Sequence, residues 1–160
     1  TFSSRGLGDV YKRQARITTW FARDVMAPRG GEANWASFIE VLKGLEGPVH
    51  LTFDIDGLDG TLVPATGTPV PGGLSYWHAV QAIEAMFSAP KATVISADVN
   101  EIARQDGTPL TQFTAAMVAT KIVGAHVSAR RAGRWEKAAA GRGGDRAPMH
   151  RHTYTRGAPN

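Results

Sequence analysis

Residues 49–56 read Val-His-Leu-Thr-Phe-Asp-Ile-Asp, a strict alternation of apolar and polar side chains. An alternation with a period of two is typical of a β-strand whose two faces meet different surroundings. The apolar residues would face a core, and the opposite face would carry the polar set His50, Thr52, Asp54 and Asp56. The strand is therefore expected to end in two carboxylates that point the same way.

Other segments of the chain predict further strands and helices. Residues 17–22 and 93–99 are apolar or β-branched runs, and we expect a strand in each. Helices are indicated by apolar residues at helical spacing and by capping and breaking residues at the segment ends. The predicted helices run from Asn34 to Gly47-Pro48, from Ser75 to about Phe87, and from Thr111 to about Val123. In the last of them, we expect Phe113, Ala116, Met117 and Thr120 to point inward.

This order of strands and helices predicts the fold class. Strands that alternate with helices are typical of βαβ units, so we expect an α/β protein with a parallel sheet covered by helices. Ligands of such sheets bind at the carboxyl ends of the strands. The rule points to residues 54–68 and 98–101, which also hold the acidic side chains.

The charge of the chain is concentrated in its last part. The net charge is +4, but residues 125–160 hold eight Lys or Arg against two Asp or Glu, so the first 124 residues carry a net charge of −2. We expect residues 125–160 to be a disordered basic tail, since they have little apolar periodicity. A nucleic-acid-binding role would rest on this tail alone, and we do not expect one for the body of the chain.

Two observations limit the remaining classes. The chain has no cysteine, which excludes disulfide scaffolds and thiolate zinc sites, and no apolar run is long enough for a membrane span. Residues 1–14 begin with Thr1 and have no helix or strand period, so we expect this segment to be spurious or disordered. We treat residues 15–124 as the folded domain.

The paired aspartates Asp54 and Asp56 are the first candidate site. On one strand face, such side chains lie about 6.5–7 Å apart, so their like charges repel unless a cation intervenes. Carboxylate ligands favour hard ions such as Mn²⁺ or Mg²⁺. The same residues are also compatible with capping the following loop, and the pair alone does not decide between the two. A calcium loop of the EF-hand type is excluded by Leu58 and Ala65, which stand where two of its ligands are required.

A longer pattern resembles a known family. Residues 52–59 read Thr-Phe-Asp-Ile-Asp-Gly-Leu-Asp, residues 64–69 read Pro-Ala-Thr-Gly-Thr-Pro, and residues 71–76 read Pro-Gly-Gly-Leu-Ser-Tyr. Together they resemble a signature of the ureohydrolases, the arginase and agmatinase family, and the similarity extends over residues 17–123. The resemblance implies a three-layer α/β/α fold with a parallel sheet. In it, this chain would be the C-terminal portion, with an incomplete N-terminal half.

The resemblance also implies roles for six acidic or polar residues. Asp54 and Asp56 would be ligands of a centre of two Mn²⁺ ions, and Asp59 would support the loop that follows. Glu101 would accept the guanidinium group of the substrate, with Thr68 nearby, so these two would be the catalytic residues. Asp98 would be an acidic residue that supports the site from outside the direct contacts to the metal ions and the substrate.

The implied reaction is hydrolysis of a guanidino group to urea and an amine, with agmatine as the first expected substrate and arginine as the second. Agmatine would place the protein in polyamine metabolism. The resemblance implies a homotrimer or homohexamer, and we expect the protein in the cytoplasm. The family's two other metal motifs, Gly-Gly-Asp-His and Asp-Ala-His-x-Asp, are not in this sequence. We therefore expect this chain alone to lack the histidine ligands and to be inactive. It would then be an inert fragment or an interaction piece.

Overall fold

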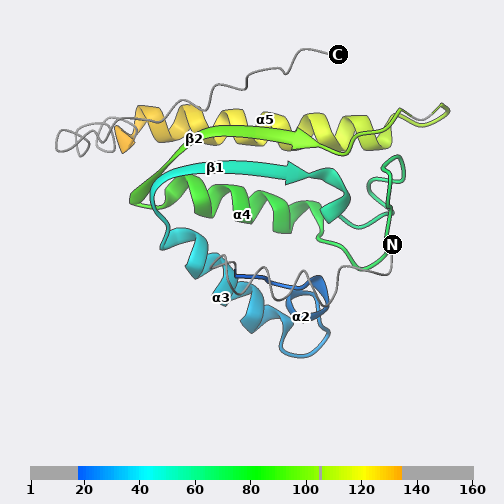
Figure 1. The fold of residues 1–160 in the computed structure, drawn as a ribbon, viewed down its shortest axis with the longest axis horizontal. Helices are drawn as coiled ribbons and strands as arrows, with labels where there is room; N and C mark the ends of the chain where they lie inside the picture. The colour runs from blue at the N-terminus through cyan, green and yellow to red at the C-terminus, as the bar shows by residue number, and fades with distance from the viewer. Residues whose placement is uncertain (1–17, 105, 135–160) are drawn as a thin grey trace, which may run out of the picture.

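A computed structural model describes residues 18–104 and 106–134. Two parallel strands, β1 (Glu46–Asp54) and β2 (Lys91–Asn100), form its sheet (Figure 1). Their pairing runs from Glu46 opposite Lys91 to Asp54 opposite Asn100, with an irregularity between Val49 and His50. Both strands and their parallel arrangement were expected from the sequence.

Helix α4 (Tyr76–Ser88) connects the two strands and begins where the sequence predicted. The side chain of Ser75 accepts a hydrogen bond from the backbone N–H of His78, which satisfies one of the free donors of the first turn. Apolar side chains of β1, β2, α4 and α5 (Leu110–Arg131) then form one core, which includes Leu51, Ile83, Phe87, Val94 and Val118. Both helices therefore lie on the same face of the sheet.

Helix α5 differs from the expectation in its buried face and its length. Phe113 is 65% exposed and Met117 is 41% exposed, whereas the buried residues are Thr111, Thr114, Ala115, Val118, Ile122 and Ala129. The predicted inward face was therefore wrong. Apolar residues lie on both sides of this helix, and the smaller ones pack against the sheet and α4. The helix also continues to Arg131, so the prediction of disorder was wrong for residues 125–131.

The first described elements are helical. Residues 18–21 form no strand and lead into α2 (Ala22–Val25), so the strand predicted at 17–22 was wrong over its described part. Helix α3 (Gly31–Lys43) begins three residues before Asn34, and its C-cap is Gly44. The Asn34 side chain instead donates a hydrogen bond to the carbonyl oxygen of Asp24, over 2.9 Å, which ties α3 to α2.

The fold is α/β, as predicted, and the described residues form two layers, the parallel sheet and the helices on one of its faces. In the described residues, helices cover one face of the sheet, and the face with His50, Thr52 and Asp54 is exposed. None of the helices in residues 18–104 and 106–134 is both long and apolar enough to cross a membrane. The expectations for residues 1–14 and 135–160 lie outside the described residues.

Candidate functional site

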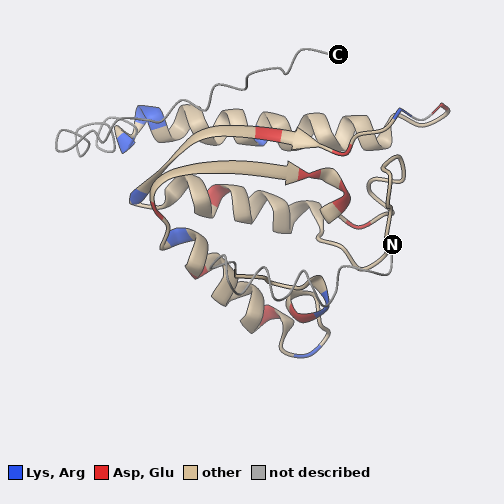
Figure 2. Cartoon of the chain, in the orientation of Figure 1, with Lys and Arg blue, Asp and Glu red and all other residues tan. Residues whose placement is uncertain are grey.

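Acidic side chains gather at the carboxyl end of the sheet. Figure 2 shows red segments at the end of β1, in the turn that follows it, and after β2. Asp54 is the last residue of β1, and Asp56 lies in the short 3₁₀ helix η1 (Ile55–Gly57). The predicted strand therefore ends two residues early. Asp54 and Asp56 are neighbours at a turn rather than alternate residues of one strand.

The long loop after η1 returns to Asp56. The Oγ1 atom of Thr68 donates a hydrogen bond to Oδ2 of Asp56, over 2.8 Å. The next residue back, Gly67, is close to Glu101, because a Cβ atom built on Gly67 would lie 3.9 Å from Oε2 of Glu101. The fold thus brings together three of the predicted site residues, Asp56, Thr68 and Glu101, from three separate segments. Asp54 makes no hydrogen bond or ion pair with another described side chain.

Asp59 holds the base of this loop. Its Oδ1 accepts hydrogen bonds from the hydroxyl of Thr61 at 2.6 Å and from the backbone N–H of Thr61 at 3.0 Å, and its Oδ2 accepts one from the N–H of Gly72 at 2.8 Å. These hydrogen bonds, above all the one from the Thr61 side chain, stabilise the carboxylate and lower the pKa of Asp59. These contacts tie Asp59 to the residues just after it and to Gly72 near the other end of the loop.

The two ends of the loop pair with each other beside Asp59. Leu58 and Leu74 form an isolated parallel bridge, and Leu58 is fully buried. At Gly73, a Cβ atom would lie 2.5 Å from the carbonyl carbon and oxygen of Leu58. Only glycine allows this approach of the two backbone segments. The Gly-rich part of the signature therefore closes the loop.

The segment after β2 places Glu101 against the same loop. Glu101 has a φ of 64°, a left-handed conformation that is uncommon for a residue other than glycine. Two residues later, the N–H of Ala103 donates to the carbonyl oxygen of Ala65 over 3.0 Å, and the N–H of Ala65 donates to the buried hydroxyl of Thr111 over 2.8 Å. These contacts hold the backbone on either side of Glu101 and so stabilise its left-handed conformation.

Asp98 lies on the exposed face of the sheet, within a polar network. Its Oδ1 accepts hydrogen bonds from Thr52 and Asn100, both at 2.7 Å, and its Oδ2 lies 3.2 Å from Nε2 of His50. The hydrogen bond from Thr52 is the largest of the effects that lower the pKa of Asp98. The other ring nitrogen of His50 lies 2.8 Å from Oγ of Ser96. Asp98 thus joins the two strands just before the acidic end of the sheet.

Sequence reasoning missed the parts that Thr52, His50 and Asn100 play in this network. The alternation did place His50 and Thr52 on the exposed face. Their partners follow only from the strand register, in which Thr52 lies opposite Asp98 and His50 opposite Ser96.

The donors at this end of the sheet suit a hard divalent ion, but they do not complete a metal site. In the described residues, no group of three or more His, Asp or Glu side chains is arranged to hold one metal ion. Asp54 and Asp56 supply oxygen donors, which Mn²⁺ and Mg²⁺ accept.

The chain is similar to known proteins in both sequence and structure. A sequence model of the arginase family matches residues 3–124, which is more than two thirds of the chain. The chain belongs to the arginase family. The matched range includes residues 3–14, whose structure lies outside the described residues. The expectation that residues 1–14 are spurious or disordered stays a prediction.

Several relatives share the matched segment. The N(1)-aminopropylagmatine ureohydrolase of Thermococcus kodakarensis is 34% identical over 103 residues, which cover 64% of this chain and 35% of that protein. The agmatinase of Pyrococcus horikoshii is 35% identical over 91 residues, which cover 57% and 31% of the two chains. The chain therefore spans about a third of the length of these curated relatives.

A solved structure supports the same relationship. The arginase from Bacillus caldovelox superimposes with a TM-score of 0.59 at 29% identity, over 73% of this chain and 38% of that one. The family and the arginase-like α/β fold, which the sequence resemblance implied, are both confirmed.

Proposed function

We propose that this chain is part of an enzyme that hydrolyses a guanidino group to urea and an amine. The observation that carries the proposal is the meeting of Asp56, Thr68 and Glu101 at the carboxyl end of the parallel sheet. This is the place where parallel α/β sheets bind their ligands. Membership of the arginase family supports the same reaction class.

Asp54 and Asp56 would contribute to a centre of two Mn²⁺ ions. Such a pair of ions, when bound, supplies a nucleophile at neutral pH and stabilises the developing charge. The role of this chain is to fix two carboxylates at the strand end. Thr68 orients one of them, because its hydrogen bond to Oδ2 of Asp56 leaves Oδ1 free to face a cation.

Glu101 would bind the guanidinium group of the substrate. A guanidinium ion stays protonated at neutral pH and pairs with a carboxylate through two parallel N–H···O hydrogen bonds. The strained turn at Glu101 and the bond between Ala103 and Ala65 hold this carboxylate beside Gly67. A fixed guanidinium acceptor lowers the entropic cost of placing the reactive carbon. Asp98, through Thr52 and His50, would keep the two strand ends in register.

Agmatine is the first substrate we propose and arginine the second. Relatives of this chain are named agmatinase and N(1)-aminopropylagmatine ureohydrolase, and both names refer to agmatine or a derivative of it. This substrate class would place the enzyme in polyamine metabolism and in the cytoplasm, and we propose a homotrimer or homohexamer as its assembly.

The chain of 160 residues would be inactive by itself. Neither histidine-containing motif of the family occurs in its sequence, and the described residues hold no three-residue metal cluster. As an inert fragment, it would retain the fold and at most an interaction role. We propose activity only for a parent protein in which both motifs precede residue 17.

Urea release tests this proposal directly. The parent protein should release urea from agmatine when Mn²⁺ is supplied, and the 160-residue chain should release none under the same conditions. A Glu101→Gln variant of the parent should lose most of its activity, because the amide cannot pair with the guanidinium charge. Full activity of Glu101→Gln would contradict the assigned substrate contact. Urea release by the short chain alone would contradict the need for the missing ligands.

A further inference from the structure

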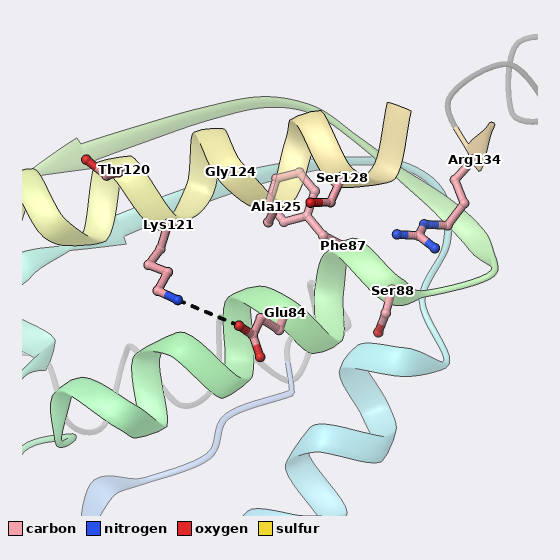
Figure 3. A pocket seen from close by; sticks show the side chains of 9 residues that line it. All are labelled: Glu84, Phe87, Ser88, Thr120, Lys121, Gly124, Ala125, Ser128 and Arg134. Carbon is pink, nitrogen blue, oxygen red and sulfur yellow. Dashed lines mark ion pairs between the residues drawn. The ribbon is translucent and has the colours of Figure 1, made fainter. Parts of the chain in front are cut away.

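A cavity lies near the amino end of the sheet, away from the acidic carboxyl end. Helix α4 starts near the carboxyl end of β1 and runs back to the start of β2, and α5 likewise runs back from the end of β2 (Figure 1). A cavity of about 400 Å³, open to solvent on one side, lies between the C-terminal halves of the two helices. It is lined by Glu84, Phe87, Ser88, Thr120, Lys121, Gly124, Ala125, Ser128 and Arg134 (Figure 3).

The guanidinium group of Arg134 is the part of the lining that indicates what kind of ligand the cavity binds. Its Nε atom is buried and has no hydrogen-bond partner in the described part of the chain. In Figure 3 the group points inward, between the C-terminal ends of α4 and α5. A buried donor on a charged group is costly to leave unpaired, and the Arg side chain cannot lose its proton. Within the described residues, the Nε atom of Arg134 therefore lacks an acceptor, since the one lining carboxylate, Glu84, faces Lys121 instead.

Two more side chains in the lining can meet an anion, Ser128 on the side of Arg134 and Lys121 at the other end of the cavity (Figure 3). The Nζ atom of Lys121 lies 4.0 Å from Oε1 of Glu84, at the limit of an ion pair and partly exposed, so it stays available to another anion. The Ser128 hydroxyl makes no hydrogen bond to another described residue. The hydroxyls of Ser88 and Thr120, in contrast, already donate to the carbonyl oxygens of Ala85 and Ala116.

The rest of the lining is apolar and leaves room for more than a bare ion. The buried ring of Phe87 and the small residues Gly124 and Ala125 form the wall between the two helices. A Cβ atom added at Gly124 would meet nothing within 4 Å, which agrees with open space beside this residue. Cavities of roughly 300–1,000 Å³ are typical of sites for small organic molecules.

We propose that this cavity binds a small organic anion. A phosphate or carboxylate group would pair with Arg134, with Ser128 on the same side of the cavity, and an apolar portion would lie against Phe87 and Ala125, toward Lys121 at the other end (Figure 3). The negative ends of the α4 and α5 dipoles oppose an anion here, and the two cations offset them. The site lies at the amino end of the sheet, so it is separate from the proposed guanidino site.

Binding of two probes to the full 160-residue chain tests the proposal. We expect calorimetry to record saturable binding of phenyl phosphate or of benzoate, and no binding of benzyl alcohol, which has the ring without the charge. The tighter of the two anions identifies the preferred group. If neither anion binds saturably, or if benzyl alcohol binds as well as they do, the proposal is wrong.

Charge variants locate the binding. Arg134→Gln should weaken binding of the preferred probe about ten- to hundredfold, the range for a hydrogen bond to a charged group. Arg131→Gln is the matched control, because Arg131 lies in the last turn of α5 but does not line the cavity, and it should change binding less than about twofold. Equal losses in the two variants would indicate a general charge effect and would overturn the site.

Two further variants do not depend on Arg134. Gly124→Leu should fill the cavity and abolish binding, whereas Ala116→Leu, at an exposed position of the same helix, should leave it unchanged. Glu84→Gln should strengthen binding about two- to fivefold, because it removes an acid that competes for Lys121. Unchanged binding in Gly124→Leu, or weaker binding in Glu84→Gln, would contradict an anion at this place.

Discussion

The hydroxyl of Thr68 donates a hydrogen bond to Oδ2 of Asp56 across 2.8 Å, and this contact closes the loop between them over the end of the sheet. It fixes the orientation of one carboxylate before any cation arrives. The loop therefore does more than connect β1 to α4, because it sets the position of an acid that we assign to metal binding.

A Thr68→Val substitution in the parent enzyme tests this orienting role. The variant keeps the shape of the side chain but loses the donor to Asp56. We expect kcat/KM for agmatine to fall about tenfold, the loss for a hydrogen bond to a charged group near the surface. Thr66→Val is the matched control, because its hydroxyl has no partner in the described residues and its loss should leave activity unchanged. Equal effects of the two substitutions would contradict the role of Thr68.

The approach of Gly73 to Leu58 predicts a stability effect. Gly73→Ala would place a Cβ atom 2.5 Å from the Leu58 carbonyl group, so we expect a loss of about 1–3 kcal/mol in the free energy of unfolding. Gly57→Ala, at the other side of the same loop, would meet nothing within 4 Å and should change stability by no more than about 0.5 kcal/mol. Urea denaturation of the 160-residue chain measures both. A neutral Gly73→Ala would show that the loop closes differently.

Two buried threonines should respond in opposite ways to replacement by valine. Thr111 accepts a hydrogen bond from the N–H of Ala65, and Thr111→Val would leave that donor buried without a partner, at a cost of about 1–3 kcal/mol. Thr93 is also buried, but its hydroxyl has no partner in the described residues. Thr93→Val should therefore be neutral or stabilising in the same denaturation experiment. A larger loss of stability in Thr93→Val than in Thr111→Val would contradict this prediction.

The lowered pKa of Asp59 predicts how stability depends on pH. Because the carboxylate is stabilised in the folded state, its contribution is present above the usual aspartate pKa of about 3.9 and is lost as the pH falls through the lower folded-state value. Asp59→Asn should lower the Tm at pH 7 and reduce its decrease between pH 5 and about pH 2. The exposed Asp106→Asn is the control and should follow the unsubstituted chain. Parallel curves for the two variants would contradict this prediction.

Local sequence patterns predicted the elements that depend on local contacts. The alternation at residues 49–56 and the cap at Ser75 gave β1 and α4 to within a few residues, because periodicity and capping act within one segment. The meeting of acids and loop residues at the carboxyl end also followed, since parallel strands present these ends together. The family resemblance supplied the roles, which the alternation alone left open.

Features that depend on distant pairing were not predictable in this way. The alternation runs through Asp56, but β1 ends at Asp54 because the strand pair ends there, opposite Asn100. The contacts of His50 depend on a register irregularity just before it, which no local pattern encodes. The predicted inward face of α5 is exposed, with Phe113 at 65% exposure, because both faces of the helix carry apolar residues and the local pattern does not separate them.

Calorimetric titration of the parent enzyme with Mn²⁺ tests the central claim most directly. We expect saturable uptake by the unsubstituted protein and a loss of most of it in an Asp54→Asn/Asp56→Asn variant with an unchanged Tm in the absence of metal. If the two proteins give the same titration curve, these aspartates do not hold the metal ions and the proposed site is wrong.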